Sequence, residues 1–166
     1  MAAHGSVPAM SELKERLRGD LTSAIKARDD VTVATLRMAL AAVSTEEVSG
    51  KSARELSDDE VLKVLNRELK KRKEAAEAFA EAGRTESANR ERAEADVLSG
   101  YLPAQLSDDE LELLVGEVIA AVTEELGSAP GQKQMGQVMK AANAKVAGRA
   151  EGGRVASVVR AKLQQG

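Results

Sequence analysis

The stretch LSDDELELLVGEVIAAV, residues 106–122, contains both the start of a helix and the face that this helix would bury. Ser107 and Glu110 have the spacing of a capping box, in which each side chain accepts a hydrogen bond from the backbone N–H of the other residue. Apolar residues then recur every three or four positions, which predicts an amphipathic helix: Leu111, Leu114, Val115, Val118, Ile119 and Val122.

The same helical pattern continues on both sides of this stretch. Ser57 and Glu60 form a second capping-box signature ahead of a long predicted helix that ends at Gly83. No run alternates with period two for long enough to predict a strand. Four further stripes have helical spacing: Leu13, Leu17, Leu21, Ala24 and Ile25; Val33, Leu36, Leu40 and Val43; Met135, Val138, Met139, Ala142 and Val146; Val155, Val158, Val159 and Leu163. The sequence predicts an all-α fold.

One segment interrupts the helical pattern clearly. Gly100 and Pro103 fall between two strongly periodic regions, and a proline disfavours the helical conformation of the residue before it. We therefore expect a hinge over 101–106. It would join an N-terminal helical domain of three to four helices (11–100) to a small C-terminal three-helix domain (107–166), with a flexible leader over 1–10.

Composition excludes several classes of enzyme. The 166-residue chain contains no cysteine, and its one histidine, His4, lies in the predicted leader, so thiolate chemistry, Ser-His catalysis and His-based metal sites are not expected. Phosphate-binding loop motifs are missing from the sequence as well. We predict no catalytic residue, no metal site and no cofactor. No apolar run is long enough to span a bilayer, which favours a cytoplasmic protein without a membrane partner.

Charge is distributed unevenly along the chain, although the formal net charge is only −3. Residues 107–126 carry seven acidic residues and no base, whereas 131–166 carry seven bases and one acid. A basic end of this kind can bind a polyanion. Alternatively, the two segments attract each other as packed neighbours, and charge alone does not decide between these interpretations.

The basic end supplies a set of candidate anion-binding residues. Lys133, Gln137 and Lys140 fall on the face opposite the apolar stripe of their helix, and Lys140 should lie in solvent. Gly152 and Gly153 begin the next helix, whose N–H groups could receive a phosphate. The candidate RNA-binding residues are Lys133, Gln137, Lys140, Arg149, Gly152, Gly153 and Arg154. The alternative is an ordinary helical hairpin with glycines at its turns.

The most conspicuous basic cluster, KKRK at 70–73, is a weaker candidate. Four consecutive helical residues point in different directions, and acidic residues follow at Glu74 and Glu77. Arg72 is different, because it falls on the apolar stripe of its helix. We expect its guanidinium to find a carboxylate, on the following helix for example, since an unpaired buried charge is costly.

Several motifs together resemble one known family. They are LRMALAA (36–42), ELKKRKEAAEAFAEAGR (68–84), YLPAQLS (101–107), MGQVMK (135–140) and VAGRAEGGRV (146–155). The chain resembles a stand-alone member of the GatB/YqeY family, and its tail is similar to the C-terminal domain of the B subunit of glutamine-dependent aspartyl/glutamyl-tRNA amidotransferase. Arg149 stands where the family usually has Lys, and Glu151 replaces a commoner Asp or Asn.

This resemblance implies an all-helical fold whose tail contacts tRNA, and an association with carbon–nitrogen ligase activity that uses glutamine as amido donor. The implied partners are tRNA or another folded RNA, and tRNA amidotransferase or aminoacyl-tRNA components. We predict a non-catalytic tRNA-binding accessory protein. Two alternatives remain open: an amidotransferase-like component acting with partner subunits, and a helical protein-interaction adaptor that uses the acidic 107–126 helix.

Overall fold

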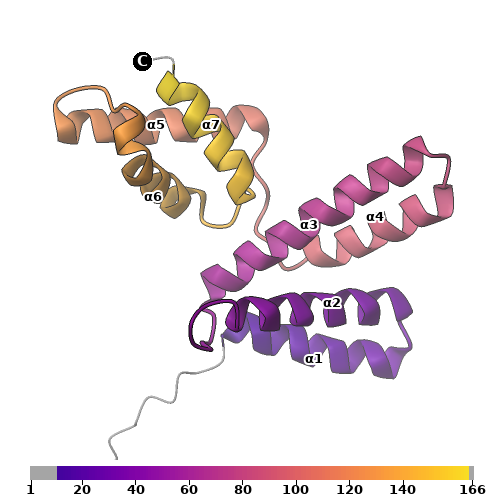
Figure 1. Ribbon diagram of the computed structural model, residues 1–166. Coiled ribbons are helices and arrows are strands. Elements are labelled where there is room, and N and C mark those ends of the chain that lie inside the picture. Colours follow the sequence, from indigo (N-terminus) through magenta and orange to yellow (C-terminus); the bar gives the residue numbers. More distant parts are fainter. Residues whose placement is uncertain (1–10, 165–166) are drawn as a thin grey trace, which may run out of the picture. The chain divides into compact units, whose positions relative to one another are not determined.

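The computed structural model describes residues 11–164, and this part of the chain is helical from end to end, with no strand (Figure 1). It forms seven α-helices and one short 3-10 helix: α1 (Glu12–Ala27), α2 (Asp30–Glu47), α3 (Asp58–Glu81), α4 (Thr85–Ser99), α5 (Asp108–Leu126), η1 (Gln132–Gln134), α6 (Met135–Val146) and α7 (Gly152–Gln164). The predicted all-α class is confirmed. The predicted leader over 1–10 lies outside the described residues.

Contacts between the helices divide the chain into two compact units, with the division between Tyr101 and Leu102. Unit 1 contains α1 to α4, and unit 2 contains α5, η1, α6 and α7. The predicted hinge and domain limits stay predictions, which limited proteolysis can test.

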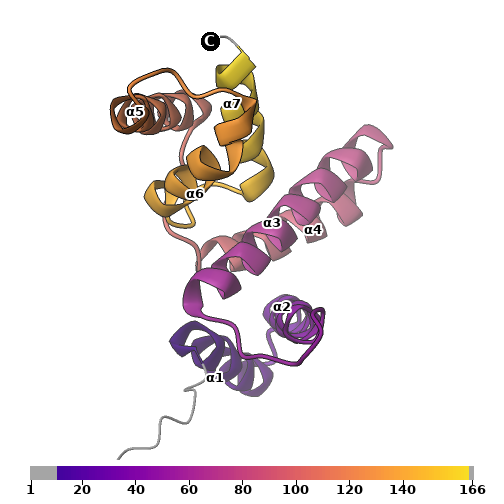
Figure 2. The same cartoon turned by 60° about the vertical axis from the view of Figure 1, so that its left-hand side comes forward.

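Unit 1 consists of two helical hairpins. Helices α1 and α2 lie side by side, as do α3 and α4, and α2 also packs against both α3 and α4 (Figures 1 and 2). The core contains no aromatic side chain and is made of aliphatic residues: Leu17, Ala24, Leu36, Ala39, Val43, Leu56, Val61, Val64, Leu65, Leu69, Ala76, Ala88, Ala95 and Leu98.

Both predicted capping boxes are present. Ser57 caps α3 and Ser107 caps α5, and in each case the glutamate three residues later accepts a hydrogen bond from the backbone N–H of the serine. The backbone N–H of Ser107 lies 3.0 Å from Glu110 Oε1 and helps to hold the pKa of that carboxyl below its usual 4.5. Local sequence therefore fixes where the two longest helices begin.

The stripe predicted for α1 was wrong at one position. Ile25 is 47% exposed, whereas Lys14 is only 4% exposed. The Lys14 ammonium donates to Glu47 at 2.8 Å and lies 3.6 Å from Glu55. A lysine can be buried here because carboxylates from the end of α2 and the loop after it surround its charge.

The expectation for Arg72 is confirmed. Its guanidinium lies 3.5 Å from Glu91 and 3.7 Å from Glu94, both on the following helix α4, and 4.0 Å from Glu68 on its own helix. All four side chains are largely buried between α3 and α4. The arginine therefore joins the two helices of this hairpin through charge, where neighbouring positions join them through apolar contacts.

In unit 2, α5, α6 and α7 pack against one another around a single core. Its residues are Leu106, Leu111, Val115, Val118, Val122, Val138, Ala142, Val146, Ala150, Val155, Val159 and Leu163. Helix α6 ends in two residues with positive φ, Ala147 at 50° and Gly148 at 81°. This left-handed turn sends the chain back toward α7.

The residues that connect the two units are anchored at both ends. The Tyr101 hydroxyl donates to Asp20 in unit 1 at 2.5 Å. In unit 2, the Leu106 N–H donates to the Arg149 carbonyl at 2.7 Å, and the Gln105 amide donates to the Gly148 carbonyl at 3.3 Å. Residues 102–104, which belong to the predicted hinge, lie between these two anchors.

Candidate nucleic-acid interface

Three of the predicted residues form one row on the outside of unit 2. Lys133 lies in η1, which continues directly into α6, and Gln137 and Lys140 follow at intervals of four and three positions. All three side chains are exposed. The opposite face of α6 is buried against the core through Val138, Ala142 and Val146. Helical periodicity therefore places the row where an external ligand can reach it, as the sequence predicted for Lys140.

The two lysines of this row have no carboxylate partner within the described residues. The segment 131–150, which includes all of η1 and α6, contains no Asp or Glu. The exposed Lys145 near the end of α6 does have a partner, because its ammonium lies 4.0 Å from Glu117 of α5. The ammonium groups of Lys133 and Lys140 are therefore available to pair with an external anion.

Arg149, a further candidate residue, does not extend into solvent, because its guanidinium folds back onto the end of α6. Its Nε donates to the Val146 carbonyl at 3.0 Å, and its Nη2 donates to the Lys145 carbonyl at 2.9 Å. These are carbonyls of the last helical turn, which need partners from outside the helix. A cation at this end also complements the helix dipole. The side chain is therefore partly buried, and its donors are used to cap the C-terminal end of α6.

The start of α7, predicted as a phosphate site, is covered by a carboxylate of the chain itself. The Arg154 N–H donates to both the Glu151 carbonyl at 3.0 Å and Glu151 Oε2 at 3.3 Å. A Cβ built on Gly153 would lie 2.9 Å from the same Oε2. The carboxylate thus rests against Gly153 and caps the helix, so an external phosphate would have to displace it.

Arg154 is also engaged within unit 2. Its Nη2 donates to the Leu106 carbonyl at 3.0 Å and to Asp108 Oδ1 at 2.9 Å. The arginine therefore connects the first turn of α7 to the first turn of α5. Pairing of the acidic with the basic segment was the alternative interpretation of the charge pattern, and it applies to Arg154 with Asp108 and to Lys145 with Glu117.

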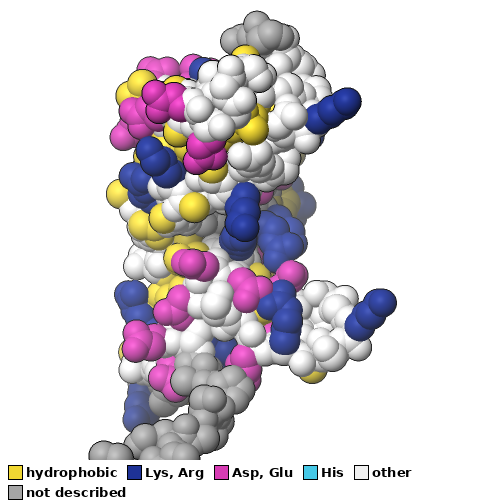
Figure 3. Space-filling model, turned by 90° about the vertical axis from the view of Figure 1, so that its left-hand side faces the viewer, with side chains coloured by type: hydrophobic (Ala, Val, Ile, Leu, Met, Phe, Trp, Pro, Cys, Tyr) yellow, Lys and Arg dark blue, Asp and Glu magenta, His cyan; other side chains and the backbone are white. Residues whose placement is uncertain are grey.

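The structure thus separates the seven predicted residues into two groups. Lys133, Gln137 and Lys140 face solvent together, whereas Arg149, Gly153 and Arg154 make contacts inside unit 2, next to the exposed Gly152. Arg160 on α7 is a further exposed cation without a carboxylate partner among the described residues. On the face drawn in Figure 3, Lys and Arg side chains stand scattered among acidic and uncharged ones. The candidate surface is therefore limited to the row formed by Lys133, Gln137 and Lys140.

The described residues offer no other obvious chemistry. Within 11–164, no group of three or more His, Cys, Asp or Glu side chains is placed to hold a metal ion. None of the helices in this range has the length and apolar composition that a bilayer-spanning segment requires. The arrangement suits contact with an anion by means of point charges, since the two lysines each present a mobile ammonium.

Comparison with known proteins assigns the family. The chain is 32% identical, over 101 residues, to an uncharacterized protein of Schizosaccharomyces pombe; the aligned part is 60% of this chain and 80% of the yeast protein. Residues 14–163, which run from α1 into α7 and include both units, match the family of YqeY-like proteins. The chain therefore belongs to the YqeY-like family.

Proposed function

We propose that this protein is a non-catalytic tRNA-binding accessory protein of the cytoplasm, and that unit 2 contacts the RNA through the row Lys133, Gln137 and Lys140. The observation that carries this proposal is the acid-free segment formed by η1 and α6, which presents Lys133 and Lys140 without carboxylate partners among the described residues on one solvent-exposed face. Two ammonium groups on one face can each neutralise a phosphate of the RNA backbone. Gln137 lies between them and can donate its amide to phosphate or ribose oxygens.

Family membership supports the same choice of ligand. The YqeY-like family is related to the C-terminal domain of the amidotransferase B subunit, and the resemblance of the tail implies contact with tRNA. Components of tRNA amidotransferase or of aminoacyl-tRNA metabolism are the protein partners that this relation suggests. Catalysis by the chain alone gains no support from the described side chains.

Recognition should depend on the shape and backbone of folded RNA. Phe79 and Tyr101 are the only aromatic residues of the chain, and both lie in unit 1. Proteins that bind single strands usually stack bases on several aromatic side chains. Unit 2 lacks such side chains, so folded tRNA should be bound in preference to an unstructured oligonucleotide.

Salt dependence provides the first test. Fluorescence anisotropy with labelled total tRNA should show binding that weakens by about 10- to 40-fold between about 50 and 200 mM salt, as expected for about two to three phosphate contacts. A labelled poly-uridine strand of similar length is the comparison ligand and should bind more weakly. Absence of salt-dependent binding to tRNA would refute the proposal.

Charge reversal locates the surface. The double variant Lys133→Glu/Lys140→Glu should lose about tenfold or more in affinity, since both phosphate contacts become repulsive. Lys70→Glu/Lys71→Glu in α3 makes the same change in net charge on two other exposed lysines and should have the smaller effect. Circular dichroism checks that both variants keep the helical spectrum of the parent, which matters most for the α3 pair, because the Lys71 ammonium lies 3.3 Å from the largely buried Glu68. A larger loss from the α3 pair would place the surface elsewhere.

A third variant asks whether the start of α7 also takes part. Glu151→Gln removes the negative charge that rests against Gly153 while keeping a side-chain oxygen that can cap the helix. Stronger tRNA binding by this variant would extend the surface to Gly152 and Gly153. Unchanged binding would confine the surface to the row on α6.

A further inference from the structure

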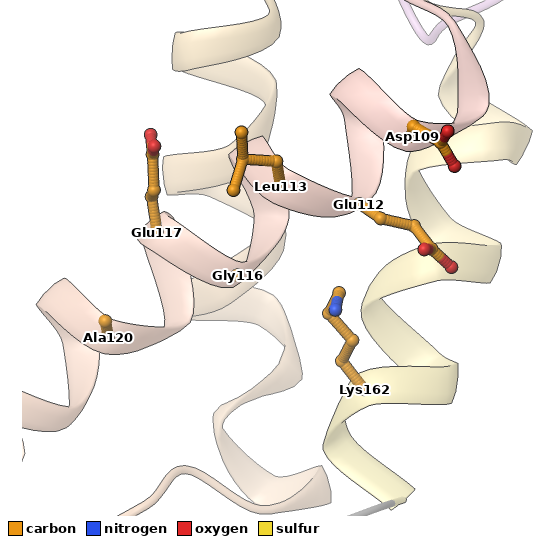
Figure 4. A pocket seen from close by; sticks show the side chains of 7 residues that line it. All are labelled: Asp109, Glu112, Leu113, Gly116, Glu117, Ala120 and Lys162. Atoms are coloured by element: carbon orange, nitrogen blue, oxygen red, sulfur yellow. The ribbon is translucent and has the colours of Figure 1, made fainter.

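Helix α5 has a second face, which packs against nothing in unit 2. Its first face carries Leu111, Val115, Val118 and Val122 into the core. The second face forms the floor of an open groove of about 510 Å³, which Lys162 of α7 borders on one side (Figure 4). The groove is lined by Asp109, Glu112, Leu113, Gly116, Glu117, Ala120 and Lys162.

The lining residues have the spacing of a helix-packing surface. Residues at positions i, i+3, i+4 and i+7 surround a hole that receives one side chain from a facing helix. Asp109, Glu112, Leu113 and Gly116 form one such set, and Leu113, Gly116, Glu117 and Ala120 form the next. The α5 part of the groove is the sum of these two adjacent holes. This geometry suits a helix with two successive anchoring side chains.

The centre of the groove is apolar, and at Gly116 no side chain covers the helix backbone. Leu113 is 67% exposed, the most exposed of the large hydrophobic side chains among the described residues. A Cβ built on Gly116 meets no atom within 4 Å, so the position beside Leu113 is open space. An apolar side chain from a partner can therefore reach the α5 backbone and cover Leu113.

The edges of the groove are acidic. Asp109, Glu112 and Glu117 contribute three carboxylates, whereas Lys162 supplies one ammonium and Lys145, outside the lining, lies 4.0 Å from Glu117. In Figure 4 the Lys162 side chain extends from α7 toward α5, on the side of the groove where Glu112 lies. Helix α5 itself contains no Lys or Arg, so an occupant with positive charge is favoured.

We propose that this groove is a docking site for a basic amphipathic helix of another protein. Two apolar side chains of that helix would occupy the two holes around Gly116, and its Lys or Arg residues would pair with Glu112 and Glu117. A nucleic acid is disfavoured because the rim repels phosphate. The site is thus distinct from the row on α6, in both position and sign of charge.

A designed peptide tests the chemistry of the occupant. The probe is a fluorescein-labelled peptide of about 18 residues, about five helical turns, with Leu at heptad a and d positions and Lys elsewhere. The control peptide carries Glu in place of Lys. Anisotropy with the full chain at about 150 mM salt should show binding of the Leu–Lys peptide and none of the Leu–Glu peptide. Equal binding of both peptides, or binding of neither, would overturn the proposal.

Variants then distinguish docking in the groove from general attraction to an acidic helix. Gly116→Gln fills the shared hole, and the open space around Gly116 lets the free protein fold as before. We expect it to weaken peptide binding about tenfold or more and to leave tRNA binding unchanged. Glu112→Lys/Glu117→Lys should weaken peptide binding similarly. Glu124→Lys/Glu125→Lys changes the net charge of α5 equally, outside the groove, and should have little effect.

Two outcomes contradict the assignment directly. If the 124/125 pair weakens binding as much as the 112/117 pair, the peptide is attracted by the charge of α5 as a whole and the groove is not its site. Sedimentation velocity of the protein alone tests the alternative that a second copy of this chain occupies the groove. Self-association that Gly116→Gln abolishes would show that a second copy of this chain occupies the groove.

Discussion

At the scale of single residues, cations inside unit 1 illustrate how much a charge depends on its partners. Lys14 is almost completely buried, and Arg72 is largely buried between α3 and α4. Each is tolerated because carboxylates surround it, and removal of the cation would leave those carboxylates without compensation. Such side chains make a helix pairing specific, since an incorrect alignment of the helices would separate the charges.

The pair formed by Lys14 and Glu47 gives a prediction that depends on pH. The hydrogen bond from Lys14 holds the pKa of the Glu47 carboxyl below its usual 4.5, so the pair stabilises the fold fully above that pH and less as the pH falls. Lys14→Met should lower the free energy of unfolding by about 1–3 kcal/mol at neutral pH, and the deficit should shrink below about pH 4.5. Urea titrations at several pH values measure it.

The exposed Lys63 on α3 provides the matched control. Lys63→Met makes the same substitution where the lysine pairs with no carboxylate among the described residues, so the change in the free energy of unfolding should stay within about 0.5 kcal/mol and should not vary with pH. A deficit in Lys14→Met that does not change between neutral and acid pH would mean that lost packing, not the ion pair, accounts for the effect.

At the scale of elements, the end of α6 shows how helix termini shape the candidate site. Ala147 adopts the left-handed conformation, which is unfavourable for a residue with a Cβ, and Arg149 supplies donors to the last turn of the helix. The turn that follows brings the chain back to α7 and places Glu151 over Gly153. The geometry of one helix end thus determines which cations remain exposed.

At this end of α6, replacement by glycine should change the free energy of unfolding in opposite directions at two alanines three positions apart. Ala147→Gly should raise the free energy of unfolding of unit 2 by about 0.5–1 kcal/mol, because glycine adopts a φ of 50° without strain. Ala144→Gly, in the exposed interior of the same helix, should lower it by about 1 kcal/mol. Thermal unfolding followed by circular dichroism compares the two. Destabilisation by both glycines would mean that the turn is not left-handed in solution.

The elements also show what the sequence could and could not predict. The capping boxes at Ser57 and Ser107 depend on residues three positions apart, so the local sequence was sufficient to predict them. The row on α6 followed from helical periodicity for the same reason. The return of Arg149 onto α6 and of Glu151 onto Gly153 depends on the path of the turn, which no local pattern specifies. The pairing of Lys14 with Glu47 joins residues 33 positions apart and depends on tertiary packing.

At the scale of the whole molecule, the connection between the two units is a short segment held at each end by one unit. Tyr101 is held by Asp20 in unit 1, and Leu106 is held by Arg149 in unit 2, which leaves 102–104 between the two anchors. Each unit has its own core, so each should remain folded when the connection is cut.

Limited proteolysis checks this arrangement. A protease of broad specificity should cleave within 102–104 well before it cleaves the long helix α3, because an enzyme must unfold a segment to bind it. The two fragments should separate by size exclusion and should each retain a helical circular dichroism spectrum. Preferential early cleavage inside α3 would contradict a division of the chain at this place.

The hydrogen bond between Tyr101 and Asp20 has a practical consequence for optical measurements. The chain contains one tyrosine, one phenylalanine and no tryptophan, and the tyrosine belongs to unit 1. Burial and the hydrogen bond to Asp20 raise the pKa of Tyr101, so the ionisation of its phenol, visible in the ultraviolet, reports on the folded state of unit 1. Unit 2 is silent at these wavelengths but contributes fully to the amide signal of its helices. Above about pH 10, where the phenol ionises once unit 1 unfolds, the phenolate absorbance therefore follows unit 1, and a change in the amide signal without a change in this absorbance belongs to unit 2.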